Sequence, residues 1–204
     1  MSYGGRDVWP RRIGLKILDA PVRGVVVGVL ILVLALSGLF GGLDRVTPDR
    51  GGLPVAQVGV AQAGAPWTVT VIRSAIFDDL PPLRLEHEGD LWLQVLATVE
   101  VTDDESRNDM REIFTLDIAG LLDAEPKYMY LGRDSTLVDY LHPGMPERIG
   151  YFWELSGSAP VPTELHILVN GKTERVDSLT GSLAWLDPGP RSELRVPVKD
   201  ERGT

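Results

Sequence analysis

A run of twenty consecutive residues without a charge, Gly24 to Leu43, constrains what this chain can fold into more than any other segment. A helix rises about 1.5 Å per residue, so this run spans about 30 Å, the thickness of the hydrocarbon core of a bilayer. We therefore predict one N-terminal transmembrane helix over residues 24–43, with the membrane as its partner.

The charges on either side of this run predict its orientation. Basic residues that precede the run keep the preceding segment in the cytoplasm. They are Arg6, Arg11, Arg12, Lys16 and Arg23. We expect residues 1–23 to form a basic cytoplasmic tail and the remainder to be extracytoplasmic, in a protein of the cell membrane. A cleaved signal peptide ending at Ala35-Leu36-Ser37 is the alternative, but the apolar run continues past that site.

Four glycines fall within the apolar run at spacings that favour helix packing. Two pairs of small residues, each four apart, lie close to one stripe of the helix. They are Gly24, Gly28, Gly38 and Gly42. We expect this stripe to pack against another membrane protein, with a simple anchor as the alternative.

Charge and composition exclude several classes of protein. The first 23 residues contain five basic and two acidic residues, and the remainder contains 15 basic against 27 acidic residues. A strongly acidic external domain does not attract phosphate backbones, so nucleic acid is not an expected partner. The chain has no cysteine, which excludes disulfides, thiol catalysis and a lipid-bearing cysteine.

The chain beyond the apolar run divides into a linker and one domain. Residues 44–66 are rich in Gly, Pro, Ala and Gln without a sustained period, which predicts a flexible linker. Residues 67–200 are long enough for a single core, and residues 201–204 form a short tail.

Alternation of apolar and polar residues predicts short strands throughout this domain. The clearest is 91–102, in which the odd positions from Leu93 to Val101 are apolar. Strands are also expected at 67–77, 113–118, 148–155, 163–169 and 193–198. We expect hairpin turns at Asn170-Gly171 and at 187–190. With no helical period after Leu43, the pattern predicts an all-β, antiparallel immunoglobulin-like β-sandwich.

Several of these segments resemble a known family. They are Gly64 to Ile72, the strand Leu91 to Thr102, and His142-Pro143-Gly144 leading into Ile149 to Leu155. The chain resembles the bacterial extracytoplasmic immunoglobulin-like domains of unknown function that follow a lipoprotein signal or a membrane anchor, and that are related to secreted mycobacterial immunoprotective antigens. The resemblance implies fold and location, and the family supplies no catalytic residues. The lipid-bearing cysteine that the family often carries is replaced here by the apolar run.

One acidic connection is a weak candidate for a metal site. Carboxylates are the ligands that calcium prefers, and four of them fall within seven residues. They are Asp103, Asp104, Glu105 and Asp109. The position at which an EF-hand loop requires its third ligand is Arg107, so a solvated loop is the favoured interpretation.

No pattern predicts catalysis. Asp134, Ser135, Asp139 and His142 contain the residue types of a hydrolase triad, but no G-x-S-x-G elbow presents the serine. The three histidines, His87, His142 and His166, lack the spacing of a metal site. We expect neither an enzyme nor a cofactor.

Two tryptophans are candidates for a surface platform that binds a sugar or a peptide. Trp92 lies opposite the apolar face of its strand, and Trp185 lies beside a turn, whereas Trp153 is in phase with core residues. The alternative for Trp92 and Trp185 is that they cover a sheet edge or a second core patch. We therefore expect a single-pass, membrane-anchored binding or interaction module of the bacterial cell envelope that is accessory to another membrane protein. The alternatives are a domain that binds a glycan, a small molecule or calcium, and then an envelope hydrolase.

Overall fold

The computed structural model describes residues 52–203, which form eight strands and one short 3-10 helix. The strands are β1 (Gln62–Gly64), β2 (Trp67–Phe77), β3 (Leu91–Val101), β4 (Phe114–Leu116), β5 (Tyr128–Leu131), β6 (Glu147–Leu155), β7 (Glu164–Val176) and β8 (Leu183–Asp200). The 3-10 helix η1 (Met110–Ile113) leads directly into β4. The described part of the chain is therefore all-β, as predicted.

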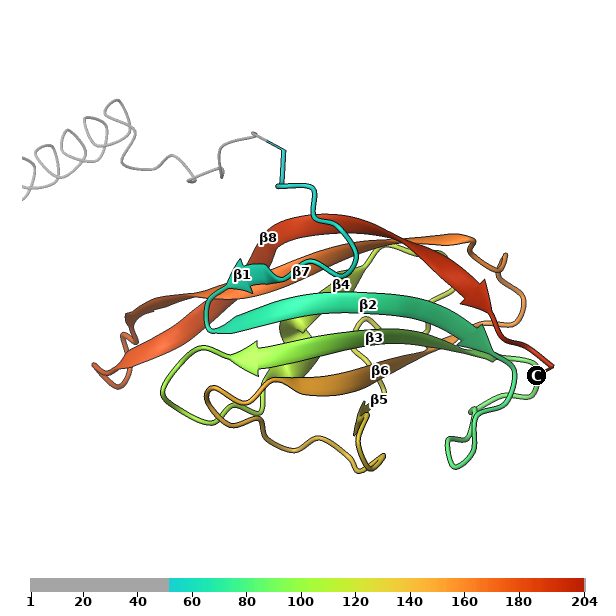
Figure 1. The fold of residues 1–204 in the computed structure, drawn as a ribbon, viewed down its shortest axis with the longest axis horizontal. Coiled ribbons are helices and arrows are strands. Elements are labelled where there is room, and N and C mark those ends of the chain that lie inside the picture. The colour runs from blue at the N-terminus through green and yellow to red at the C-terminus, as the bar shows by residue number, and fades with distance from the viewer. Residues whose placement is uncertain (1–51, 204) are drawn as a thin grey trace, which may run out of the picture. The chain divides into compact units, whose positions relative to one another are not determined.

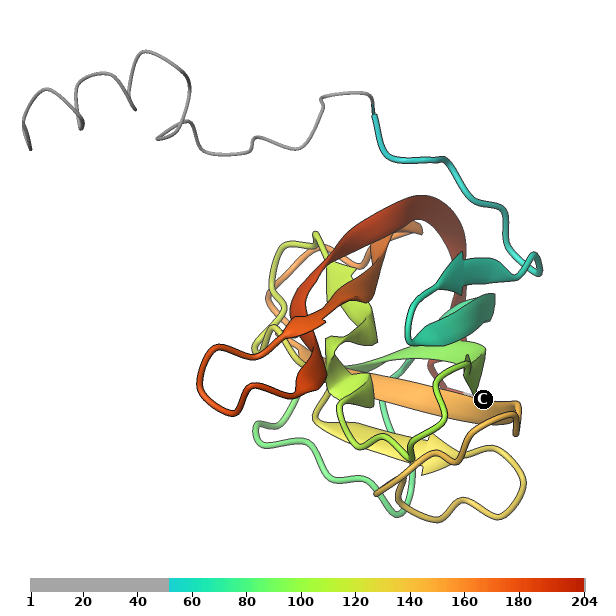
Figure 2. The same ribbon diagram turned by 90° about the vertical axis from the view of Figure 1, so that its left-hand side faces the viewer.

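The strands form two layers that enclose one core (Figures 1 and 2). One layer has the order β2-β3-β6-β5, and the other has the order β4-β7-β8. Neighbours within each layer are antiparallel. The layers join where the end of β8 pairs in parallel with β2, at Ser74 to Ile76. The domain is thus a β-sandwich that is closed along one side.

The core follows the predicted alternation. The odd-numbered residues of β3 from Leu91 to Val101 are buried, and those of β6 from Ile149 to Leu155 face them in the same layer. Leu165, Ile167 and Val169 of β7 approach this core from the second layer. The predicted strands at 67–77, 91–102 and 148–155 are confirmed to within one residue at each end.

Both predicted hairpin turns are wrong. Strand β7 continues through Asn170-Gly171 to Val176, and β8 runs through 187–190 with irregular register. Glycine is needed at position 171 because the side chain of Arg191 lies close to the backbone there, and a Cβ would lie 2.9 Å from Arg191 Cγ. The turn falls instead at 177–182, where Asp177 N donates to Ser182 O at 2.8 Å.

The domain begins before the predicted position of Trp67. Strand β1 pairs with the start of β2, and Ala56 N donates to Glu193 O at 2.7 Å. Residues 52–66 therefore belong to the folded unit, although their composition predicts a linker. Backbone hydrogen bonds hold this segment on the domain, although its side chains show no periodic pattern.

The predicted membrane helix, 24–43, lies outside the described residues, as do the basic tail and the glycine stripe. Within residues 52–203, no helix has the length and apolar character needed to cross a membrane.

Candidate functional site

Aromatic side chains gather on the outer face of the first layer, away from the core. Three neighbouring strands contribute them: Trp92 from β3, Phe152 from β6, and Tyr128 and Tyr130 from β5. The ring centroids of Trp92 and Tyr128 are 5.7 Å apart, and those of Tyr130 and Phe152 are 6.2 Å apart. Adjacent strands place these rings side by side because outward positions of paired strands share a face.

A loop, residues 78–90, covers part of this aromatic layer. Leu80, Leu83 and Leu85 of the loop pack against the rings, and Leu83 is buried. Trp92 is 0% exposed beneath them, so the prediction that it forms a surface platform is wrong. The outward face of β3 is a second, smaller core, since the loop shields apolar side chains that a bare sheet would leave in water. Trp185 is half-buried in β8 opposite Glu174.

Three charged residues, which we call the loop clamp, fasten the loop to the sheet. Glu154 of β6 is only 2% exposed, and its Oε1 accepts a hydrogen bond from Glu86 N in the loop. Lys127 Nζ lies 2.5 Å from Glu154 Oε2 and 2.8 Å from Glu86 Oε1. The same ammonium group lies 5.8 Å from the centroid of the Trp92 ring. The clamp therefore holds loop, strand and aromatic layer together.

The charges within the loop clamp reinforce one another. Burial lowers the pKa of Lys127, but the hydrogen bonds that Lys127 donates to Glu154 and Glu86 outweigh burial and raise the pKa above its usual value. The hydrogen bond that Glu86 accepts from Lys127, together with the positive charge of Lys127, lowers the pKa of Glu86. Lys127 and Glu86 consequently stay charged over the neutral range.

Where the loop leaves the sheet uncovered, a pocket of about 230 Å³ opens beside the aromatic layer. We call it the aromatic pocket. It is lined by Leu80, Pro81, Pro82, Leu83, Gln94, Tyr130, Ser135 and Phe152. Gln94 Oε1 is buried and has no hydrogen-bond partner among the described residues. An unpaired buried acceptor costs about 1–3 kcal/mol, so a group that pairs with this amide would be favoured in the pocket.

Gly150 of β6 leaves room for the side chains of two residues that line this pocket, Phe152 and Gln94. A Cβ at this position would lie 2.9 Å from Phe152 Cε2 and 3.3 Å from Gln94 Nε2. The ring of Phe152 and the amide of Gln94 therefore occupy space that any other residue would fill.

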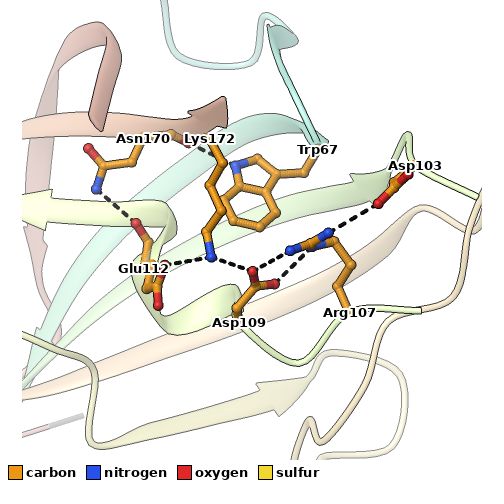
Figure 3. A network of polar contacts seen from close by, with 7 residues as sticks. All are labelled: Trp67, Asp103, Arg107, Asp109, Glu112, Asn170 and Lys172. Carbon is orange, nitrogen blue, oxygen red and sulfur yellow. Dashed lines mark hydrogen bonds and ion pairs between the residues drawn. The ribbon is translucent and has the colours of Figure 1, made fainter. Parts of the chain in front are cut away.

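A second polar cluster, which we call the ion-pair network, lies between the two layers (Figure 3). Asp109 Oδ2 is 2.5 Å from both Lys172 Nζ and Arg107 Nη2. Arg107 Nη1 also reaches Asp103 Oδ2 at 3.1 Å, and Lys172 Nζ reaches Glu112 Oε2 at 2.8 Å. The network joins the loop before η1 to the middle of β7.

Trp67 forms the buried wall of the ion-pair network. Its Nε1 donates to Asn170 O at 2.8 Å, and both Arg107 and Lys172 lie 5.8 Å from the ring centroid. Burial raises the pKa of Asp109, but the hydrogen bonds from Arg107 and Lys172 outweigh it and hold that pKa below its usual value. Every cation of the network has a carboxylate partner, so we assign this cluster to stability rather than to binding.

The predicted calcium candidates divide into two groups. Asp103 and Asp109 point toward Arg107 and serve as its ion-pair partners, whereas Asp104 and Glu105 are exposed. Across residues 52–203, no three His, Asp or Glu side chains are grouped so as to hold a metal ion. Arg107, at the position where an EF-hand loop requires its third ligand, thus supplies the positive charge that pairs with Asp103 and Asp109.

The residues that have the types of a hydrolase triad do not form one. His142 Nδ1 contacts Ser106 Oγ at 2.8 Å, on an exposed surface. Asp134 Oδ1 accepts hydrogen bonds from Thr136 N and Oγ1, and Ser135 lies at the aromatic pocket. His87 belongs to the covering loop, and His166 of β7 contacts Glu193 at 3.1 Å.

Sequence reasoning missed the aromatic pocket, although part of the signal was present. The phase of β3 places Trp92 and Gln94 outward, and the phase of β6 does the same for Phe152. Strand β5 has only four residues and was not predicted, so its tyrosines had no assigned face. The covering loop carries no periodic pattern at all.

Comparisons with known proteins add little to this geometry. No family model and no curated protein matches the chain. The chain is similar to the crystal structure of an uncharacterized β-sandwich protein from Clostridium difficile, with 9% sequence identity and a TM-score of 0.45. That similarity covers 71% of this chain and 93% of the other.

Proposed function

We propose that this chain is a single-pass membrane-anchored, extracytoplasmic binding module of the bacterial cell envelope. The uncharged run of residues 24–43 and the basic residues before it support the anchor and its orientation. The immunoglobulin-like class of the sandwich, and kinship with the extracytoplasmic domains that the sequence resembles, belong to the same proposal. The module acts by binding and not by catalysis.

The aromatic pocket is the proposed binding site. The observation that carries this assignment is the amide of Gln94, which has a buried, unpaired Oε1 within a pocket otherwise walled by rings, prolines, leucines and Ser135. Binding sites characteristically combine apolar walls with a few polar groups that orient the ligand. The loop clamp keeps one wall in place before a ligand arrives, so little order has to be gained on binding.

A second function is favoured by the four glycines of the apolar run. As an accessory subunit, the chain would pack Gly24, Gly28, Gly38 and Gly42 against a helix of another membrane protein. Cross-linking of the full-length protein in native membranes tests this, with the four glycines replaced by leucine as the control. A stoichiometric partner that is lost on substitution supports the accessory function. An unchanged set of partners leaves the helix as an anchor only.

The absence of cysteine makes the membrane topology directly measurable. A cysteine is introduced either as Ser2→Cys in the tail or as Ser178→Cys, which is exposed in the turn after β7. A maleimide that does not cross membranes should label Ser178→Cys in intact spheroplasts, and Ser2→Cys only after lysis. Labelling of both variants only after lysis would refute the extracytoplasmic placement.

Binding at the pocket is measured on the full-length protein in detergent by ligand-observed NMR. The probes are neutral single-ring compounds, namely methyl pyranosides, p-cresol and indole. Saturation transfer to at least one probe, abolished by Gly150→Ala, supports the assignment. If no probe binds, or if binding survives Gly150→Ala, the pocket is not the binding site.

A further inference from the structure

The lining of the aromatic pocket is uncharged. None of its eight residues is acidic or basic, although the chain as a whole carries a net charge of −9. A charged ligand would lose its hydration on entering and find no opposite charge there, which is costly in free energy. The pocket therefore favours a neutral ligand over a charged one.

The size of the pocket restricts the ligand further. Its volume of about 230 Å³ lies below the range of about 300–1,000 Å³ that is typical of sites for drug-sized molecules. A single six-membered ring with its substituents suits such a volume. A lipid chain or an extended peptide would have to leave most of its length outside.

Three of the residues that line the pocket have neutral polar groups. The hydroxyls of Tyr130 and Ser135 and the amide of Gln94 are neutral hydrogen-bonding groups, and each can donate or accept. The terminal torsion of a glutamine side chain is broad, so either end of the amide can turn toward a ligand. Tyr130 and Phe152 lie edge to face, with an interplanar angle of 76°, and offer an aromatic surface beside these groups.

Resting on the proposed binding function, we propose that the aromatic pocket binds the ring of a neutral pyranose sugar. A pyranose has a face of C–H groups and a rim of hydroxyls. The face matches Tyr130 and Phe152, and the rim matches Gln94 and Ser135. A purely aromatic ring would fill the same space but would leave the buried amide of Gln94 unpaired, at a cost that a hydroxyl group removes.

The test compares binding of the same probes by two matched variants of strand β3, each in the full-length protein. Gln94→Leu keeps the approximate volume of the side chain and removes its hydrogen bonds. Thr98→Val makes an equivalent change on the same outward face, outside the pocket. Methyl glucopyranoside, methyl mannopyranoside and the methyl glycoside of N-acetylglucosamine are titrated by calorimetry and by ligand-observed NMR. Thermal unfolding shows that each variant folds.

We expect at least one methyl pyranoside to bind, with affinity about tenfold weaker in Gln94→Leu and within about twofold of the parent in Thr98→Val. Ser135→Ala, on the exposed rim, provides a second variant that does not disturb the core, with an expected loss of about threefold. Equal affinity in Gln94→Leu and Thr98→Val would overturn the proposal.

The control probes separate this inference from the proposed function. If p-cresol or indole binds and no pyranoside does, the sugar class is wrong while the pocket remains a binding site. If no ring compound binds at all, both proposals fail.

Discussion

At the scale of single residues, Gly150 explains how a pocket can exist on a pleated sheet. The outward position next to an aromatic residue on the same strand is normally filled by a side chain. Here Phe152 leans over the bare backbone of Gly150, and Gln94 of the neighbouring strand reaches over it as well. The glycine has no positive φ to account for it, so space is the reason for its presence.

Gly150→Ala should therefore close the pocket from below. The new methyl group would come within 2.9 Å of the Phe152 ring, so the ring must move toward the space that a ligand uses. We expect a loss of stability of about 1–3 kcal/mol, typical of overpacking, together with the loss of probe binding. Urea unfolding and ligand-observed NMR measure the two effects. Full retention of binding would show that the probes bind elsewhere than in this pocket.

At the scale of elements, the loop clamp determines how much of the aromatic layer water can reach. The covering loop, residues 78–90, has no regular hydrogen-bond ladder, and its contacts to the rest of the domain include the hydrogen bond from Glu86 N to Glu154 and the ion pair between Glu86 and Lys127. Asp90 Oδ1 adds a hydrogen bond from Gly157 N at 2.9 Å. Loops held by few contacts open at a low free-energy cost, so the loop is the element most sensitive to changes in this clamp.

Glu154→Gln should loosen this loop without unfolding the sandwich. The amide oxygen can still accept from Glu86 N, but Lys127 loses its buried negative partner, and a charged hydrogen bond contributes about 1.5–3 kcal/mol. Hydrogen exchange in peptides from residues 78–90 should accelerate by about tenfold or more, while that of β3 changes little. Glu88→Gln, an exposed carboxylate in the same loop, is the control. Equal acceleration in both variants would contradict the role given to Glu154.

The elements also show where sequence patterns stop being informative. Alternation located β2, β3 and β6, because each carries nine or more residues with one face in the core. It failed at Asn170-Gly171, where the pair has the composition of a turn but Asn170 Nδ2 donates to Glu112 O at 2.8 Å. Contacts with residues about 60 positions away favour continuation of the strand there, through an irregular register. The local preference of Asn-Gly for a turn does not reveal these distant contacts.

At the scale of the whole molecule, local sequence patterns predict the fold but not the site. Apolar periodicity is a local signal, and it predicts the class of the domain and most of its core. The aromatic pocket draws on β3, β5, β6 and the covering loop, which only tertiary structure brings together. The carboxylates of the acidic loop are evident in the sequence. Nothing local in the sequence links them to Lys172, which pairs with Asp109 from a distant strand.

The ion-pair network should make the stability of the whole domain depend on acidity. The pKa of Asp109 is lower in the folded chain than its ordinary value of 3.8, so the unfolded chain binds more protons as pH falls through that range. The stabilisation from this carboxylate is complete above about pH 5 and is lost progressively below about pH 4. Asp200, with a pKa of about 2, adds to the same trend, so no single substitution removes it entirely.

Asp109→Asn should accordingly flatten, but not abolish, the loss of stability between pH 5 and pH 3. At pH 7 we expect the variant to be less stable by about 1–3 kcal/mol, because Arg107 and Lys172 each lose a partner in a half-buried site. Urea unfolding of the full-length protein at several pH values measures both effects. Asp104→Asn, an exposed carboxylate in the same loop with no ion pair among the described residues, should match the parent at each pH. If the two variants lose acid sensitivity equally, the effect belongs to the net charge of the domain. If only Asp109→Asn loses acid sensitivity, the stability of the domain depends on this network, which joins residues 63 positions apart along the chain.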